Sequence, residues 1–186
     1  LQRDANRLLG FTAQQTLDYL QNLYEKKLCT YPRTDSRYLT SDMAEGLPVL
    51  VNLVANAMPF RKGIAISCDA AAVINDKKVT DHHAVIPTRN IREADLTALP
   101  VGERAILELV ALRLLCAVAQ PYTFAETAVV VECAGAEFTA KGRTVKQPGW
   151  RALDAAYRAS MKSAPEQDGN SEDKALPELT EGQELP

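Results

Sequence analysis

Tyr31 and Arg33, separated by one proline, are the residues whose types and spacing could do chemistry. A phenol has a pKa of about 10, so Tyr31 is a poor nucleophile unless a neighbour favours its phenolate or activates the group that it attacks. Residues i and i+2 of an extended chain point to the same side, which lets Arg33 address that group. A guanidinium fork suits two phosphate oxygens and stabilises charge that grows on them. The pair therefore predicts attack of a tyrosine on a phosphate ester.

The residues around this pair favour a fixed local geometry. Pro32 fixes its own φ and biases Tyr31 toward the extended region, which would keep the two side chains in register. Asp35 and Ser36 can close a turn by bonding local backbone groups. Two further donors for phosphate follow the pair, Thr34 and Arg37. From these residues alone, a surface turn before a capped helix, with a half-buried tyrosine and no chemistry, remains the alternative.

The segment before Tyr31 has the signals of a helix that ends shortly ahead of it. Thr12 and Gln15 have the spacing of a capping box. Apolar side chains then recur at helical spacing, so we expect the helix to run to about residue 26 or 27. Residues 28–31 are short and β-prone, and a proline stops them. Tyr31 is therefore predicted on a short extended piece that follows a helix.

Two further helices are expected after this motif. The first would begin after Thr40, with its first turns disturbed by Pro48, and it would end at Pro59. The second follows Pro100 and is the clearest in the sequence, because apolar residues over 106–117 fall on one amphipathic face. A mostly helical part therefore extends to about residue 120.

The rest of the chain has an extended rather than a helical pattern. Residues 60–92 have few helical signals and are predicted to form loops with short extended pieces, such as 84–87. Beyond residue 120 the period becomes alternating, and residues 127–133 and 137–141 predict a β-hairpin. The predicted fold class is α+β, with one domain at 1–120 and a β-containing part at 121–186.

The charge is distributed unevenly along the chain. There are 21 basic and 24 acidic residues, a net charge of −3. Residues 162–186 hold two lysines and seven acids, so residues 1–161 hold 19 basic and 17 acidic residues, a net charge of +2. A mildly basic body permits contact with DNA without requiring it. The polar stretch 162–175 is expected to be a mobile acidic loop.

Composition also limits the cellular setting and the kinds of site. No apolar run approaches the roughly 20 residues that span a bilayer, and no signal peptide is visible. The four cysteines are scattered without a CxxC pair, which favours reduced thiols in a cytoplasm and argues against a zinc site. Because the chain starts without a methionine, we expect it to be a segment of a longer protein.

Five segments, in one order, resemble the signatures of a known family. Residues 28–39 resemble the active-site tyrosine motif of type IA DNA topoisomerases, and most closely that of the bacterial topoisomerase III branch. The other segments look like the family's approach to the tyrosine, its second signature and two later strand segments. They are residues 1–11 with 23–28, residues 81–88, residues 148–151 and residues 179–183. The resemblance covers nearly the whole chain.

The resemblance implies an ATP-independent enzyme that relaxes or unlinks DNA. Tyr31 would attack a phosphate of single-stranded DNA, stay linked to the 5′ phosphate and free a 3′ hydroxyl, which reverses the reaction after strand passage. Arg33 matches the family arginine that supports the scissile phosphate. By the same resemblance, residues 1–120 would be a helical, winged-helix-like domain of the catabolite-activator type. Residues 121–186 would belong to the neighbouring β-rich arch.

His82 matches the histidine of the family's second signature, which lies near the bound DNA and the tyrosine. It could donate to phosphate or transfer a proton. His83 would point away, because adjacent residues of an extended chain point apart. The same geometry argues against a rolling-circle nuclease, whose two metal-binding histidines are separated by one residue. The expected DNA-binding set is His82, Thr34, Asp35, Ser36 and Arg37.

One half of the family's active site is absent from this sequence. The family carries an Asp-x-Asp-x-Glu motif in a separate acidic domain that handles Mg²⁺, and no such motif occurs here. We therefore expect no metal site or cofactor in this segment, with single-stranded DNA and the acidic domain as its partners. The segment alone is expected to be inactive, and the alternative is a non-catalytic module that binds single-stranded DNA. The resemblance implies a bacterial, cytoplasmic, nucleoid-associated protein, expected to be a monomer without membrane contact.

Overall fold

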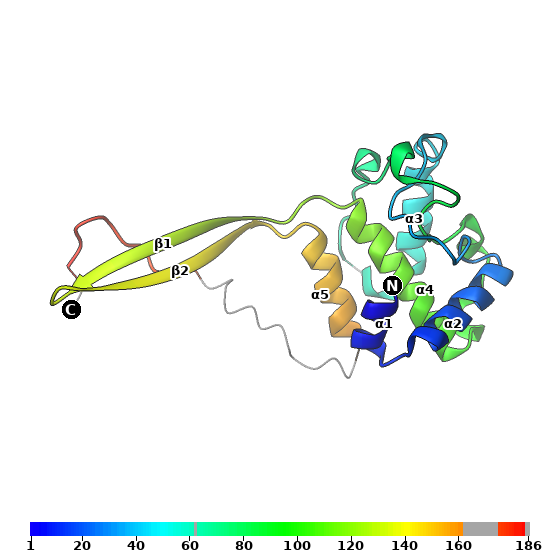
Figure 1. Cartoon of the computed structure of the whole chain (residues 1–186), viewed down its shortest axis with the longest axis horizontal. Coiled ribbons are helices and arrows are strands. Elements are labelled where there is room, and N and C mark those ends of the chain that lie inside the picture. Colours follow the sequence, from blue (N-terminus) through cyan, green and yellow to red (C-terminus); the bar gives the residue numbers. More distant parts are fainter. Residues whose placement is uncertain (62, 162–174, 185–186) are drawn as a thin grey trace. The chain divides into compact units, whose positions relative to one another are not determined.

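The computed structural model describes residues 1–61, 63–161 and 175–184. Almost all of the acidic loop expected at 162–175 lies outside these residues. Helices and an antiparallel pair of strands make up the described part, so the chain has the predicted α+β fold (Figure 1). No helix in these ranges is both long and apolar enough to cross a membrane.

The described residues form two compact units. The first unit consists of residues 1–120 and 150–161, and the second of residues 121–149 and 175–184. The first unit is helical and contains Tyr31, whereas the second contains the strands. The catabolite-activator likeness of the helical unit stays a prediction.

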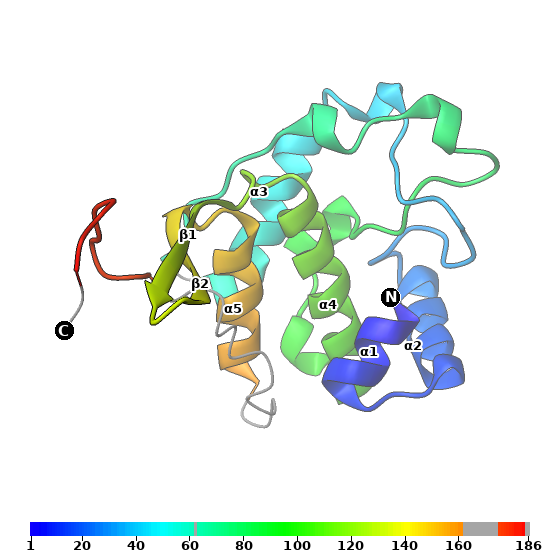
Figure 2. The same cartoon turned by 60° about the vertical axis from the view of Figure 1, so that its left-hand side comes forward.

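α4 lies at the centre of the first unit and packs against its other four α-helices (Figures 1 and 2). The helices are, in chain order, α1 (Gln2–Leu9), α2 (Ala13–Glu25), α3 (Leu47–Ala57), α4 (Val101–Ala117) and α5 (Trp150–Ser160). Short 3₁₀ turns connect α3 to α4 across residues 59–98.

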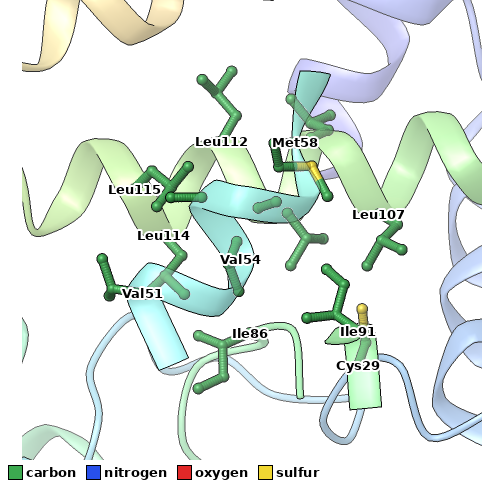
Figure 3. Close-up of a cluster of buried hydrophobic side chains, with 14 of the residues drawn as sticks. Cys29, Val51, Val54, Met58, Ile86, Ile91, Leu107, Leu112, Leu114 and Leu115 are labelled. Atoms are coloured by element: carbon green, nitrogen blue, oxygen red, sulfur yellow. The ribbon is translucent and has the colours of Figure 1, made fainter. Parts of the chain in front are cut away.

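α4 is buried on almost all sides. Ile106 and Leu109, on the predicted face, are buried, but so are Leu107 and Leu112 on other sides. The prediction of a single amphipathic face is therefore wrong, because the surrounding helices cover this helix from several directions. Figure 3 shows the core where α3 meets α4, with side chains of both helices and of the connecting segments.

The capping box expected from the sequence starts α2. The Thr12 hydroxyl accepts a hydrogen bond from the backbone N–H of Gln15 at 3.1 Å, and the Gln15 side chain accepts one from the N–H of Thr12 at 2.9 Å. Phe11 packs edge-on against Tyr19, with 5.2 Å between the ring centroids, and so fixes the entry of the chain. The helix ends at Glu25, close to its predicted end.

The segment after the tyrosine motif folds differently from its prediction at one point. A 3₁₀ turn at Ser41–Met43 stands where the helix was expected to begin, and α3 starts only at Leu47. Pro48 therefore opens the helix and does not disturb it. The N–H groups of a first turn have no partner inside the helix, and the fixed φ of proline suits that position. The helix ends before Pro59, as predicted.

The predicted hairpin is confirmed in the second unit, with longer strands. β1 (Thr123–Cys133) and β2 (Ala136–Gln147) pair antiparallel. The two connecting residues, Ala134 and Gly135, have φ angles of 52° and 80°. Two successive positive φ values are those of a type I′ turn, whose twist matches that of the strands.

Two segments that resembled family strands are not strands here. Trp150 begins α5, in which Leu153 and Tyr157 are buried four residues apart, the spacing of one helical face. Residues 179–183 contain a turn and no strand.

A buried carboxylate ties α2 to α4. Glu103 is 4% exposed and accepts hydrogen bonds from Asn22 Nδ2 at 3.0 Å and from Lys26 Nζ. The Lys26 side chain is 44% exposed. Loss of the lysine leaves a buried carboxylate without its cation, whereas loss of the carboxylate leaves an ammonium group that water still reaches.

Lys26→Met is therefore expected to destabilise the protein more than Glu103→Gln. We expect the free energy of unfolding to fall by about 3 kcal/mol for the lysine variant and about 1 kcal/mol for the glutamate variant. Urea unfolding of both variants measures the difference. Equal losses, or a larger loss for Glu103→Gln, would contradict this account of the pair.

Candidate active site

Tyr31 lies on an extended segment that pairs with the segment carrying His82. We call residues 28–38 the tyrosine segment and residues 82–88 the histidine segment. Of the hydrogen bonds that join them, three follow one another in antiparallel order. They run from the Thr30 N–H to the Ile86 carbonyl (2.9 Å), from the Thr88 N–H to the Leu28 carbonyl (2.9 Å) and from the Thr34 hydroxyl to the His82 carbonyl (2.8 Å).

A turn in the left-handed region leads from α2 into the tyrosine segment. Lys27 has a φ of 58°, which is uncommon for a residue other than glycine. Its carbonyl accepts hydrogen bonds from the Thr88 hydroxyl and from Asn90 Nδ2, the latter at 3.2 Å. The last residue of the histidine segment, Thr88, and Asn90 just beyond it thus hold the turn that places Tyr31.

The ring of Tyr31 lies against two other rings. It meets Tyr24 edge-on, with 5.5 Å between centroids and 85° between planes, and it is tilted against the His82 imidazole at 4.3 Å and 40°. Tyr31 is half-buried, whereas Tyr24 and His82 are exposed. The fold thus brings His82 to the tyrosine, and it adds Tyr24, which no sequence signal had connected to Tyr31.

Arg33 and Tyr31 contact the same face of α2. Arg33 is exposed, and its Nη1 donates to the Gln21 side-chain oxygen at 3.3 Å. Gln21 lies one helical turn before Tyr24, which contacts Tyr31, and residues three apart are neighbours on a helix. Pro32 between the pair is buried. The guanidinium and the phenol are therefore presented from one short segment against one helix face.

Of the four residues after Arg33, two have side chains that are hydrogen-bonded within the described part of the protein and two have side chains that are not. The Thr34 hydroxyl accepts a hydrogen bond from the Ser36 N–H at 3.1 Å, and the Ser36 hydroxyl donates to the Lys78 carbonyl at 2.9 Å. These two side chains hold the segment in shape. Asp35 and Arg37 are exposed, and their side chains make no hydrogen bond or ion pair with the described residues.

His83 is placed differently from His82. Its Nδ1 lies 2.7 Å from the carbonyl oxygen of Ala84, its neighbour in the chain. His82 has its ring against Tyr31.

A cleft of about 1140 Å³ adjoins the tyrosine segment. Pro32 and Arg33 form part of its wall, while α1, α2 and α4 supply most of the remainder. Five arginines and two aspartates line it: Arg3, Arg7, Arg33, Arg37 and Arg113, with Asp4 and Asp35. The charge of the lining suits an anionic ligand.

The cysteine nearest to Tyr31 in sequence is not a nucleophile. Burial raises the pKa of the Cys29 thiol to about 12, so it stays protonated at neutral pH. Burial likewise raises the pKa of Cys116 to about 12. All four cysteines are free thiols.

The family resemblance implies Mg²⁺, and the residues present do not fit it. Among residues 1–61, 63–161 and 175–184, no three His, Cys, Asp or Glu side chains come together as a metal site requires. We therefore derive no chemical step through a metal bound by this chain.

Known proteins match the chain over its whole length. A family model described as "DNA topoisomerase" matches residues 1–186. Proteins named DNA topoisomerase 3 from Bacillus licheniformis and Bacillus subtilis are 40% and 38% identical over 194 and 193 residues, which cover 100% of this chain and 25% of each relative. The DNA topoisomerase 3 of Shouchella clausii is 39% identical over 158 residues, covering 81% of this chain and 21% of that protein.

The chain thus spans about a quarter of the length of the curated relatives that it matches. The five motifs of the sequence resemble those of the type IA class and occur in the same order. The family match extends from the first residue to the last. The chain belongs to the DNA topoisomerase family, in its type IA class.

Proposed function

We propose that this chain supplies the nucleophile of a topoisomerase, with Tyr31 attacking a phosphate of single-stranded DNA. The observation that carries the proposal is the placement of the Tyr31 ring between Tyr24 and His82, with Arg33 on the same helix face. A nucleophile fixed in this way loses little freedom when it reaches the reacting geometry. The family membership supports the same reaction class.

The reaction exchanges one phosphodiester for another. The Tyr31 oxygen forms a bond to phosphorus, the bond from phosphorus to the 3′ oxygen breaks, and the 5′ phosphate stays on the tyrosine. The phenolic proton leaves, and the freed 3′ oxygen takes one up. Arg33 stabilises the charge on the phosphate oxygens, and His82 is close enough to the phenol ring to assist proton transfer or contact phosphate. Religation is the reverse reaction, so no ATP is needed.

The carboxylates and Mg²⁺ of the complete enzyme would come from outside this chain. We therefore expect the chain alone to form no covalent adduct with labelled single-stranded DNA in the presence of Mg²⁺. A chimera supplies the comparison: the Bacillus licheniformis DNA topoisomerase 3 with this chain in place of its matching segment. Adducts trapped by denaturation should appear with the chimera and not with the chain alone.

Either of two results would overturn part of this proposal. An adduct formed by the chain alone would show that its own residues suffice for cleavage. A chimera that folds but forms no adduct, while the unmodified relative forms one, would show that this chain cannot supply the nucleophile.

The arginine-lined cleft favours a second candidate function, a module that binds single-stranded DNA without cleaving it. The two functions differ at Tyr31. Binding of single-stranded DNA would persist without the phenolic oxygen of Tyr31, whereas cleavage of the DNA would be lost.

A further inference from the structure

We infer that Thr88 is a positioning residue for Tyr31 and acts through the turn at Lys27, which precedes the tyrosine segment. The inference rests on the proposed function and deepens it, because Thr88 acts on the backbone that carries the nucleophile and not on the DNA. Thr88 is the last residue of the histidine segment and lies far from Tyr31 in the sequence.

The chain reverses its direction between α2 and Tyr31. Tyr24 lies in the last turn of α2, and the ring of Tyr31 returns to it with 5.5 Å between the ring centroids. Two hydrogen bonds form the reversal. The Lys27 N–H donates to the Tyr24 carbonyl at 2.8 Å, and the next N–H, that of Leu28, donates at 2.8 Å to the carbonyl of Leu23. These two bonds are those of the Schellman motif that ends many helices.

Lys27 occupies the left-handed position of this motif, with a φ of 58°. Glycine is the usual residue there, because a Cβ atom crowds the backbone in this conformation. The side chain of Lys27 is exposed and makes no hydrogen bond or ion pair with the described residues. A left-handed turn made with lysine therefore depends on the partners of its backbone.

Thr88 supplies these partners for two consecutive carbonyls of the turn. Its hydroxyl donates to the Lys27 carbonyl, and its N–H donates to the Leu28 carbonyl at 2.9 Å. The same hydroxyl accepts from the Asn90 N–H at 3.3 Å and so caps the 3₁₀ turn Arg89–Arg92. Asn90 Nδ2 also donates to the Lys27 carbonyl, at 3.2 Å. The hydroxyl of Thr88 is thus held by one turn while it holds the other.

Loss of this hydroxyl would let the turn at Lys27 relax. The Lys27 carbonyl would keep a single hydrogen bond, from the Asn90 amide. A right-handed Lys27 directs the following residues elsewhere, so Tyr31 would leave its place against Tyr24. Attack requires the phenolic oxygen to be aligned with phosphorus, and a displacement of about 1 Å can lower a rate by up to about 10²-fold. Because no charge is removed, the affinity for DNA should change little.

The test measures single-turnover cleavage by the chimera over a range of oligonucleotide concentrations. Thr88→Val replaces the hydroxyl by a methyl group of similar size, and it should lower the maximal cleavage rate by roughly tenfold. The half-saturating DNA concentration should stay within about twofold of that of the parent chimera. Thr88→Ser keeps the hydroxyl and should restore most of the rate.

Thr97→Val is the matched control for the loss of a threonine hydroxyl. The Thr97 hydroxyl donates to Asp95 at 2.6 Å, in the 3₁₀ turn Leu96–Ala98 ahead of α4. This variant should cleave as the parent chimera does. Urea unfolding of each variant checks that cleavage is measured on folded protein.

A glycine at position 27 tests the route by which Thr88 acts. Glycine adopts the left-handed conformation without the help of Thr88. The double variant Thr88→Val/Lys27→Gly should therefore cleave within about threefold of Lys27→Gly alone, although Thr88→Val by itself is slow. A threonine that touched the DNA or the phenol would not be rescued in this way.

Hydrogen exchange on this chain alone gives a second readout that needs no cleavage. The amides of Lys27 and Leu28 should exchange faster in Thr88→Val, and the Thr12 cap at the other end of α2 should keep its protection. Unchanged exchange at Lys27 and Leu28 would show that Thr88 does not hold the turn.

The inference is also overturned if Thr88→Val cleaves at the parent rate, if only its half-saturating concentration changes, or if glycine at position 27 fails to restore the rate. These failures differ from failure of the proposed function. If Tyr31→Phe abolishes the adduct while the Thr88 variants cleave normally, the nucleophile stands and the role of Thr88 is wrong. If the adduct survives Tyr31→Phe, the proposed function is wrong, and Thr88 does not position the nucleophile.

Discussion

Tyr31→Phe in the chimera should abolish the covalent adduct with single-stranded DNA. The substitution removes one oxygen and keeps the ring that packs between Tyr24 and His82, so the site should keep its shape. Without that oxygen no phosphotyrosine bond can form, and loss of a covalent nucleophile lowers turnover by a factor on the order of 10⁶ in well-studied enzymes. Relaxation of supercoiled plasmid should fall below detection together with the adduct.

Tyr19→Phe is the matched control for this experiment. Tyr19 belongs to the same helix as Tyr24, but its ring packs against Phe11 at the other end of that helix. We expect the control to cleave as the parent chimera does. If an adduct persists in Tyr31→Phe, another residue is the nucleophile and the assignment of Tyr31 is wrong.

Arg33→Ala should slow cleavage by roughly 10²-fold, the size expected when one preorganised donor to a developing charge is lost. Arg33 is exposed, and its guanidinium is held by a single 3.3 Å hydrogen bond to Gln21, so its removal should leave stability nearly unchanged. Single-turnover cleavage and religation rates of the chimera, with urea unfolding of the chain, separate the chemical effect from a structural one.

Two further substitutions sharpen the assignment of Arg33. Arg33→Lys keeps a charge but loses the planar fork, so we expect partial recovery of the rate. Arg92→Ala removes an exposed arginine outside the cleft and should leave the rate unchanged. Wild-type rates of both cleavage and religation in Arg33→Ala would remove this residue from the mechanism.

Elements whose signals are local could be predicted from the sequence. The start of α2 depends on Thr12 and Gln15, three residues apart, and the hairpin turn depends on Gly135 between two alternating runs. Pro48 shows the limit of such signals, because a proline ends a helix or opens one depending on where the first turn falls. The residues next to Pro48 in the sequence do not determine where the first turn of α3 begins.

Features that depend on packing between distant segments could not be predicted in the same way. Because residues i and i+2 of an extended chain point to the same side, the sequence predicted a common orientation for Tyr31 and Arg33. It did not predict that Tyr24 and Gln21 of α2 contact them. The proximity of His82 was expected from the family resemblance alone, and its physical cause is the pairing of the two segments. The spacing of the apolar residues of α4 predicted one buried face, and it did not show that helices distant in sequence cover the other sides as well.

The hydrogen bonds between the tyrosine and histidine segments have a consequence for how the site opens. Backbone groups of the two segments donate hydrogen bonds to each other, so neither segment can leave its place without breaking hydrogen bonds of the other. The two segments should therefore act as one cooperative unit, whose amides share a common opening free energy in hydrogen exchange. If Tyr31 carries a DNA end, as proposed, that end would stay beside His82 whenever the two segments move as one unit.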